Sequence, residues 1–587
     1  MAPITHVNDL PGSWISADLL SPITNDEGLD VAKSVAPRVS QLLSGSPAVL
    51  DSLFHPDGFW RDLVALSWSL RTFHPTSVIS AKVNPLIQRA GIIPESIALQ
   101  EDQVAVVPLP NGVIVVRAPF VFKTSTPATT CTAVFKLIRL KNGTINVFTA
   151  TTTLLELDAM PWSKVPPEVS KEIPETLPDA VDVLIVGGGH SGLTVSSHLK
   201  AMGVNFALVE ANVAIGDSWA KRYDSAKLHT TRPYSGLPYV PLPDDFPQYI
   251  PAKKMAAYYA QYAKDMQIPA YPGRRSTAAT WDADKDAWKV TLTLTTEQGG
   301  QQVLFAKHLV FAVGIGGRVP NMPDYPGMET FRGESLHSGV YTNASRWAGK
   351  RVAIVGASTT ALDMLGAASA TVVQRGPTRL YLRGQLAAAQ KVFWPGDGSM
   401  TQEVGDTLAS EDPNILQSQL SAIMMKALKD AADPEYYEDL RKAGFLHEPE
   451  GPIHQQVFCR IGAHYPDVGA CDAIRSGEIL IKSGTPISSI TPRGITFDDG
   501  SKLDHLDVIV WATGFQKDSR QSAALIVGEE VVQKLDPGEV RGCFRPSGND
   551  RIWFQGGELQ SIRHFGKFLA LQVAADVAGV RPKPCTA

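Results

Sequence analysis

The sequence predicts an α/β fold with two Rossmann-like dinucleotide-binding domains, preceded by a separate α+β domain. Three observations lead to this prediction. The chain has 587 residues, and a length of this order suggests about three domains. A glycine-rich strand–turn–helix pattern occurs twice, at 181–211 and at 350–375. Residues 1–175, which precede the first pattern, contain no glycine-rich loop and therefore need a fold of their own.

Residues 1–175 show a helical start around 30–70, which includes GFWRDLVALSWSLRTF at 58–73. Four strand-like runs follow, VAVVPL, GVIVVRAPFVF, CTAVFKLIRL and INVFTATTTLLEL. Helices followed by a curved antiparallel sheet predict an α+β cone, with Trp60 and Trp68 in its core. The proline-rich stretch at 161–180 predicts an extended linker to the rest of the chain.

The first glycine-rich pattern begins with VDVLIVG at 181–187, a continuous apolar run typical of a buried parallel strand. In the loop that follows, the first glycine permits a tight turn, the second lets the backbone approach a pyrophosphate, and the third lets the helix pack closely on the strand. The second strand, NFALVE, ends in Glu210, whose carboxylate can accept hydrogen bonds from a ribose. A turn that merely tightens a strand–helix corner is the alternative. The loop residues expected to bind the dinucleotide are Gly187, Gly189, His190, Ser191 and Gly192.

The second pattern, KRVAIVGASTTALDMLGAASATVVQR at 350–375, ends differently. Its second strand leads to Arg375, where a guanidinium can bind a 2′-phosphate that a carboxylate would repel. The second cofactor is therefore predicted to be NADPH, and a structural unit with a surface arginine is the alternative. Ser358 and Ala361 replace the second and third glycines, so hydroxyl groups are expected to help hold the pyrophosphate. The residues expected to bind here are Gly356, Ser358, Thr359, Thr360 and Arg375.

Composition and charge exclude several function classes. The chain is 44% hydrophobic and 19% charged, with a formal net charge of −5. It has no basic run that would follow a phosphate backbone, so nucleic acid is not an expected partner. Its five cysteines form no CxxC pair, so no structural metal is expected. The N-terminus has no secretory pattern and no apolar run reaches about 18 residues, so we expect a cytoplasmic protein without a membrane partner.

Between the two patterns, FRGESLHSGVY at 331–341 fits FxGxxxHxxxY through Phe331, Gly333, His337 and Tyr341. This stretch resembles the signature of the flavin-containing monooxygenases, which use FAD and NADPH. The tyrosine at its last position resembles the N/S-oxygenating and YUCCA-like branch. GDSW at 216–219, VFAVGIGGRVPNMP at 310–323 and VIVWATGF at 508–515 are similar to other landmarks of the family. By this resemblance, further cofactor-binding residues are expected at Gly216, Ser218, Trp219, Leu228, Thr513 and Gly514.

The resemblance implies a reaction. NADPH reduces FAD, and O₂ then forms a C4a-hydroperoxyflavin that transfers one oxygen atom to a small organic substrate. N- or S-oxygenation and oxidation of a carbonyl or α-keto acid remain open, and secondary metabolism is one context for either reaction. In YDSAKLHTTRP at 223–233, which also resembles the family, His229 and Thr230 are the candidate catalytic residues beside the flavin. A histidine that only satisfies a backbone carbonyl is equally compatible with the pattern.

The N-terminal segment FWRDLVALSWSLRTF resembles the start of a nuclear-transport-factor-2-like (NTF2-like) domain. This resemblance implies a structural or dimerising module, and hence a possible homodimer. We therefore expect an NTF2-like domain with linker over 1–175, a first FAD-binding part over 176–340, an NADPH-binding domain with a helical insert over 341–495, and a return to the FAD-binding domain over 496–587. Substrate selection is expected in the insert at 385–470 and in 555–572, because long insertions near a cofactor usually form pocket walls.

Two other readings of the sequence remain. An NADPH oxidase or flavin reductase would use the same two loops, although a disulfide reductase needs a dithiol near one of them. The other interpretation is a scaffold protein with a remnant flavin domain. The intact first set of glycines and Arg375 argue against it.

Overall fold

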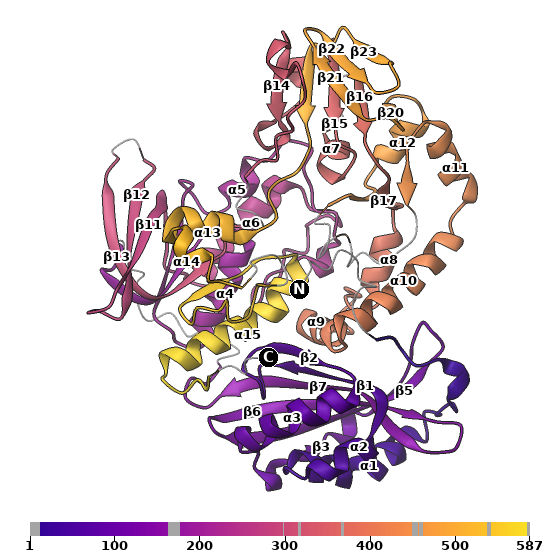
Figure 1. Ribbon diagram of the computed structural model, residues 1–587, viewed down its shortest axis with the longest axis vertical. Helices are drawn as coiled ribbons and strands as arrows, with labels where there is room; N and C mark the ends of the chain where they lie inside the picture. Colours follow the sequence, from indigo (N-terminus) through magenta and orange to yellow (C-terminus); the bar gives the residue numbers. More distant parts are fainter. Residues whose placement is uncertain are drawn as a thin grey trace.

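The computed structural model describes residues 12–162, 176–296, 299–314, 319–364, 369–448, 456, 462–536 and 542–583. Figure 1 shows the N-terminal domain at one end of the molecule and two α/β parts at the other. Helices α9 and α15 lie between these regions. Most of the predicted linker, residues 163–175, falls outside the described residues.

The N-terminal domain is a curved sheet with helices on one side. Its strands follow the order β2-β1-β7-β6-β5-β3, with β4 paired to β5, and β1 runs parallel to β7. The four strand-like runs predicted from the sequence correspond to β4 through β7, which confirms them. The elements are α1 Gly28–Leu43, α2 Leu50–Leu53, β1 Phe54–Leu63, β2 Leu70–Phe73, α3 Thr76–Ala90, β3 Ala98–Leu99, β4 Ala105–Pro108, β5 Ile114–Ser125, β6 Ala128–Arg139 and β7 Ile145–Leu157.

The prediction of a helix over 58–73 is wrong, because β1 and β2 occupy most of that stretch. Every residue from 58 to 63 is buried, so the strand is covered on both faces and lacks the alternation that marks a half-exposed strand. A stretch without this alternation does not show the two-residue period that distinguishes a strand from a helix. Trp60 and Trp68 are buried as predicted, with exposures of 0% and 3%. The NTF2-like character of the domain stays a prediction.

The first nucleotide-binding part contains a sheet of order β10-β9-β8-β13-β12-β11, with β25 paired to β13. Strands β8, β9 and β10 are parallel, and α4 connects β8 to β9 as the sequence predicts. Helix α15 packs against α4. The elements are β8 Ala180–Val186, α4 His190–Ala201, β9 Phe206–Glu210, α5 Asp217–Ala220, α6 Ala252–Asp265, β10 Ala270–Pro272, β11 Arg274–Asp282, β12 Ala287–Leu294, β13 Gln301–Phe311, α13 Ser519–Val527, α14 Glu529–Val532, β25 Ile552–Phe554 and α15 Leu559–Val577.

The second part is built on a five-stranded parallel sheet of order β14-β24-β15-β16-β20. The sheet begins at Glu334 and its last strand ends at Trp511, so this part extends beyond 341–495 at both ends. A three-stranded antiparallel sheet lies beside it. The elements are β14 Glu334–His337, β15 Arg351–Val355, α7 Thr359–Asp363, β16 Ser369–Gln374, β20 Leu480–Ser483, β21 Ile487–Thr491, β22 Gly494–Phe497, β23 Lys502–Asp504 and β24 Val508–Trp511.

The insert is largely helical, as expected, and reaches toward the N-terminal domain (Figure 1). Two short strands of the insert pair in parallel with the strand Thr378–Tyr381, which precedes it. Residues 449–455 and 457–461 fall outside the described residues. The elements are β17 Thr378–Tyr381, α8 Gln385–Lys391, α9 Gln402–Ser410, α10 Asn414–Asp430, α11 Pro434–Lys442, β18 His447–Glu448, β19 His464–Pro466 and α12 Ala470–Arg475.

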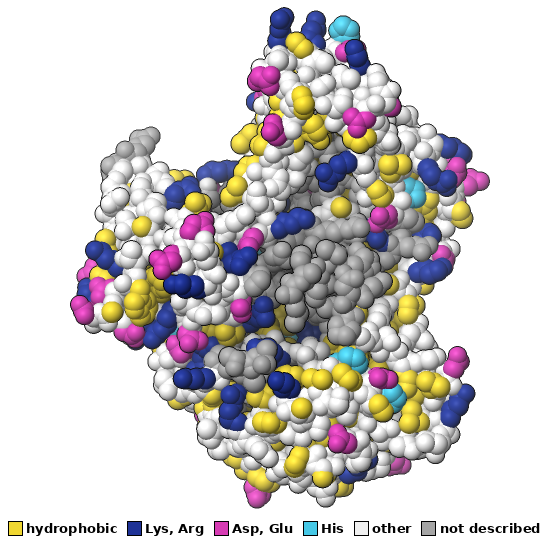
Figure 2. Space-filling model, viewed as in Figure 1, with side chains coloured by type: hydrophobic (Ala, Val, Ile, Leu, Met, Phe, Trp, Pro, Cys, Tyr) yellow, Lys and Arg dark blue, Asp and Glu magenta, His cyan; other side chains and the backbone are white. Residues whose placement is uncertain are grey.

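The surface carries charges of both signs. On the face shown in Figure 2, Lys and Arg side chains are interspersed with Asp and Glu, in keeping with the small net charge. Among the described residues, no helix combines the length and the apolar character needed to span a bilayer.

Candidate functional site: two nucleotide loops and the contact between them

The first glycine-rich loop has the geometry that a dinucleotide needs. Gly187 has a φ of +110°, and a β-carbon there would lie 2.6 Å from the Ala312 carbonyl oxygen. A β-carbon at Gly192 would lie 1.9 Å from the Gly187 carbonyl oxygen, so the first turn of α4 requires glycine. At Gly189, by contrast, no heavy atom lies within 4 Å of the β-carbon position. The loop therefore borders open space at the N-terminus of α4, where a pyrophosphate fits.

Glu210 at the end of β9 is fixed against this loop. Its Oε2 accepts a hydrogen bond of 2.7 Å from the Gly188 amide, and its Oε1 accepts bonds of 2.7 Å from the amide and the side chain of Asn212. The carboxylate is thus oriented beside the phosphate loop, as the ribose-binding role requires. Ser191 is buried, and the His190 ring lies 3.4 Å from the Gly557 carbonyl oxygen, just before α15.

The GDSW segment lies under the same loop. Gly216 has a φ of +94°, and a β-carbon there would lie 2.4 Å from the Ala256 carbonyl oxygen of α6. Trp219 is buried and meets Tyr259 edge to face, with ring centroids 6.2 Å apart. Ser218 is half-buried, and Leu228 is buried where its amide donates to Ile250.

The second loop combines one required glycine with two hydroxyl groups that already have partners. Gly356 has a φ of +125°, and a β-carbon there would lie 2.4 Å from the Ala512 carbonyl oxygen. The hydroxyls of Ser358 and Thr359 both donate to the His464 carbonyl oxygen, at 2.9 and 3.0 Å. In this arrangement the hydroxyls hold β19 beside the loop instead of facing a phosphate. Thr360 is half-buried at the start of α7 and contacts Tyr223.

Arg375 follows β16 and is exposed, so its guanidinium is accessible to a 2′-phosphate. Arg375→Ala is expected to raise KM for NADPH about 10- to 100-fold, because a charge-assisted hydrogen bond contributes roughly 1.5–3 kcal/mol. KM for NADH should change much less. Steady-state flavin reduction with both coenzymes measures this, and equal effects on the two would contradict the assignment of Arg375.

The return strand contributes Thr513 and Gly514. The Thr513 hydroxyl donates to the Asn321 carbonyl oxygen at 2.5 Å, and the Gly514 carbonyl oxygen accepts from His337 Nε2 at 3.0 Å. His337 Nδ1 accepts from the Gly339 amide, which fixes the tautomer, and burial lowers the pKa of the ring. Tyr341 is buried against Trp347, with ring centroids 5.3 Å apart. The FxGxxxHxxxY stretch thus packs the connection between the two parts.

His229 lies at the contact between the two nucleotide-binding parts. Its Nε2 is 2.9 Å from Asp363 Oδ2, at the end of α7, and its Nδ1 is 2.8 Å from the Pro466 carbonyl oxygen. The two contacts engage both ring nitrogens with oxygen atoms. Neither nitrogen is free for a substrate in this arrangement. Thr230 lies close by, but its hydroxyl pairs with that of Ser235 at 2.8 Å.

Asp363 is a residue of this site that the sequence did not indicate. Besides His229, it accepts a hydrogen bond from the Tyr223 hydroxyl at 3.2 Å, and its carbonyl oxygen accepts from Ser225 at 2.6 Å. The only sequence signal is its place at the end of the helix that follows the second loop. The partners lie about 130 to 140 residues away along the chain, which no local pattern reveals.

Among the described residues, no group of three or more His, Cys, Asp or Glu side chains is arranged to hold a metal ion. Cys131, Cys471 and Cys543, the cysteines that the structure describes, are buried and form no disulfide with one another.

Comparison with known proteins connects the region that contains both loops with a family. Residues 182–383 match the model of the flavin-binding monooxygenase-like family. This part of the chain is similar to that family. The match spans both glycine-rich loops and the FxGxxxHxxxY stretch between them, which confirms the resemblance seen in the sequence. The protein is a flavin-dependent monooxygenase, with FAD and NADPH as its cofactors.

Among curated relatives, a probable indole-3-pyruvate monooxygenase of Arabidopsis thaliana, YUCCA10, is 29% identical over 340 residues, which cover 57% of this chain and 81% of the relative. The indole-3-pyruvate monooxygenase YUCCA8 of Oryza sativa subsp. indica is 28% identical over 411 residues, or 68% of this chain and 90% of the relative. Among solved structures, a flavin-containing monooxygenase from Stenotrophomonas maltophilia is 19% identical with a TM-score of 0.47, and covers 68% of this chain and 100% of its own. A cyclohexanone monooxygenase from Rhodococcus sp. Phi1 is also 19% identical with a TM-score of 0.47, and covers 69% of this chain and 85% of its own.

Proposed function

We propose that the protein transfers one oxygen atom from O₂ to a small organic substrate, and that this substrate is an α-keto acid. The substrate class is inferred from the likeness to two relatives, a probable indole-3-pyruvate monooxygenase and an indole-3-pyruvate monooxygenase. The alignments cover 81% and 90% of the lengths of these relatives. In this reaction, RCOCOOH, O₂, NADPH and H⁺ give RCOOH, CO₂, NADP⁺ and H₂O. The two electrons from NADPH reduce one oxygen atom to water.

The residues of the chain bind, orient and exclude water. NADPH and FAD, when bound, supply the hydride and the activation of O₂. The open space at Gly189 and the carboxylate of Glu210 fit an FAD pyrophosphate and ribose, and the exposed Arg375 fits the 2′-phosphate of NADPH. His229 holds the two parts together through Asp363 and thereby acts as a positioning residue.

The insert covers one side of the segment that contains His229 and Thr230. The side chain of Gln390 in α8 accepts a hydrogen bond of 3.0 Å from the Thr231 amide. Gln402 in α9 donates to the Pro233 carbonyl oxygen at 3.0 Å. These contacts support a role for the insert in limiting access of water to the reacting atoms, which an oxygen transfer needs in order to avoid release of H₂O₂.

The proposal is tested with the purified flavoprotein by measuring NADPH oxidation, O₂ uptake and H₂O₂ release. We expect phenylpyruvate or indole-3-pyruvate to give CO₂ and the carboxylic acid that is one carbon shorter, with less H₂O₂ than NADPH consumed. Thioanisole, a tertiary amine and cyclohexanone serve as comparison substrates. A product from the sulfide or amine alone would contradict the α-keto acid assignment. Stoichiometric H₂O₂ with every compound would instead favour an NADPH oxidase.

A further inference from the structure

We propose that the Glu411–Asp412 pair anchors the insert to the N-terminal domain, and that Arg117 and Lys136 of that domain are thereby positioning residues for the flavin site. The inference rests on the binding of FAD and not on the proposed substrate. It gives the N-terminal domain a role in the same reaction, although this domain contributes no residue to either nucleotide loop.

The anchor is a buried ion cluster between segments far apart in the sequence. Arg117 Nε and Nη2 lie 2.9 and 2.8 Å from Glu411 Oε1, and Lys136 Nζ lies 3.3 Å from Glu411 Oε2 and 2.7 Å from Asp412 Oδ2. The side chains of Glu411 and Asp412 are 4% and 8% exposed. Arg61 also donates to the Asp412 carbonyl oxygen. The two acids lie between α9 and α10, so the anchor fixes both helices.

The cations and hydroxyls that receive this pair form a row across one face of the sheet. Arg117 of β5 pairs with Lys136 of β6, and Lys136 pairs with Thr149 of β7. Side chains at paired positions of neighbouring strands lie on the same face. Two residues further along β7, Thr151 pairs with Arg61 of β1 and donates to the Glu411 carbonyl oxygen at 2.6 Å. The row therefore binds both the side chain and the backbone of Glu411.

The charges in this cluster depend on one another. Burial alone would lower the pKa of Lys136, but Asp412 and Glu411 raise it above its usual value. Burial opposes ionisation of Glu411, yet Lys136 and Arg117 lower the pKa of its carboxyl group. Buried charges are tolerated only when they are paired, so the insert is held in one position relative to the sheet.

From the anchor, a series of hydrogen bonds leads through α9 to the first glycine-rich loop. Ser410, at the end of α9, accepts a hydrogen bond of 2.6 Å from Gln560 in the first turn of α15. One turn earlier, Asp406 accepts two bonds from Arg563 at 2.7 and 2.8 Å. The Gly557 carbonyl oxygen, just before α15, contacts His190 beside Gly189. The position of α9 therefore determines that of the segment next to the FAD loop.

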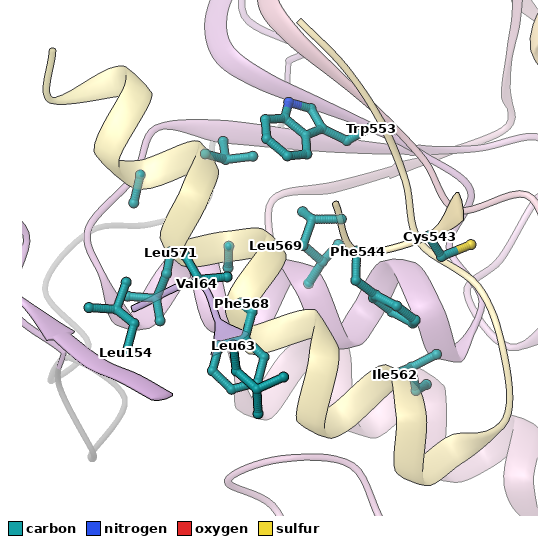
Figure 3. Close-up of a cluster of buried hydrophobic side chains, with 14 of the residues drawn as sticks. Leu63, Val64, Leu154, Cys543, Phe544, Trp553, Ile562, Phe568, Leu569 and Leu571 are labelled. Atoms are coloured by element: carbon teal, nitrogen blue, oxygen red, sulfur yellow. The ribbon is translucent and has the colours of Figure 1, made fainter. Parts of the chain in front are cut away.

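An apolar contact supports the same arrangement. Leu63, Val64 and Leu154 of the N-terminal domain lie beside Phe568 and Leu571 of α15 in the hydrophobic core (Figure 3). The guanidinium carbon of Arg61 lies 5.6 Å from the centre of the Phe565 ring, also on α15. The first turn of α10 adds Ile415 and Leu416, which pack in a cluster with Phe148 on the same sheet. Helix α15 and the first turn of α10 thus both cover this region of the N-terminal sheet.

The test compares Arg117→Met and Lys136→Met with a matched control, Arg139→Met, in the FAD-loaded full chain. Arg139 lies on the same strand as Lys136, but its ion pair is with Glu27 of the same domain and is more exposed, at 22% and 43% for the two side chains. Hydrogen exchange of 402–416 and 555–563 should become about tenfold faster in the two test variants, because the anchor no longer opposes local opening. FAD should dissociate about tenfold faster as well, since the segment beside His190 loosens. Arg117→Lys should recover part of both effects, and Arg139→Met should show neither.

The inference is overturned if exchange increases only within the N-terminal sheet while 402–416, 555–563 and FAD dissociation stay at wild-type rates. Should either methionine variant not fold, Thr151→Val removes one hydrogen bond to Glu411 at nearly constant volume and should give a smaller effect in the same segments. None of these measurements involves a substrate. Failure to oxygenate α-keto acids would therefore contradict the proposed function without affecting this test.

Discussion

Gly189→Val is expected to give a folded protein that does not retain FAD. The backbone at Gly189 is extended, with φ −78° and ψ −175°, a conformation that valine adopts readily. No heavy atom lies within 4 Å of its β-carbon position, so the protein itself accommodates the side chain. The valine would instead fill the space that the pyrophosphate needs, and we expect FAD affinity to fall by about 100-fold or more. The ratio of flavin to protein absorbance after purification measures the loss.

Gly376→Val is the matched control for this variant. Gly376 also has open surroundings and no positive φ, but it follows β16 in the second nucleotide-binding part. It should retain FAD fully. Circular dichroism and the melting temperature of both variants should match the wild-type protein. Full flavin content in Gly189→Val would mean that the loop is only a tight turn.

The nucleotide-binding framework was predictable from sequence because its determinants are local. The strand, the glycines, the helix and the terminal Glu210 lie within about 30 residues of one another. At Gly187 and Gly192 the structure shows why glycine is needed, because a β-carbon there would collide with a backbone carbonyl oxygen. The N-terminal strands over 105–157 were predictable for the same reason. The stretch at 58–73 was not, because burial on both faces of β1 removes the alternation that identifies a strand.

The contacts that join the parts could not be predicted, because their two halves lie far apart in the chain. Asp363 meets His229 across 134 residues, and Glu411 meets Arg117 across 294. Each acid looks like an ordinary helix-end carboxylate in the sequence, and only the fold shows that Asp363 is buried against His229 and Glu411 against Arg117. The insert was expected to select substrate, and the structure adds that it connects the N-terminal domain to α15. Its role in substrate selection stays a prediction.

Arg563→Met is expected to destabilise the flavin part by about 3–5 kcal/mol, because it leaves a buried carboxylate without its cation. Arg563 is 4% exposed, and its guanidinium binds both oxygens of Asp406. The same group donates to the carbonyl oxygens of Tyr234 and Gly236 at 2.6 and 2.9 Å. These carbonyls belong to the segment that follows His229 and Thr230, so the substitution should loosen the neighbourhood of the flavin as well as α9. Thermal unfolding followed by flavin fluorescence should show release of FAD at a lower temperature.

Two further variants separate the effect of the buried charge pair from the general effect of removing a cation. Lys534→Met removes one partner of the exposed Lys534–Glu530 pair, and should change stability by less than about 1 kcal/mol because surface ion pairs contribute little. The double variant Asp406→Leu/Arg563→Met removes both buried charges, and should recover part of the lost stability since no carboxylate is then left unpaired. Its recovery will be incomplete, because Trp394 donates to Asp406 at 2.9 Å and loses that acceptor. If the double variant were less stable than Arg563→Met alone, the unpaired carboxylate would not be the cause of the loss. The bonds from Arg563 to the Tyr234 and Gly236 carbonyls would then hold this segment, with Asp406 serving mainly as an acceptor for Trp394.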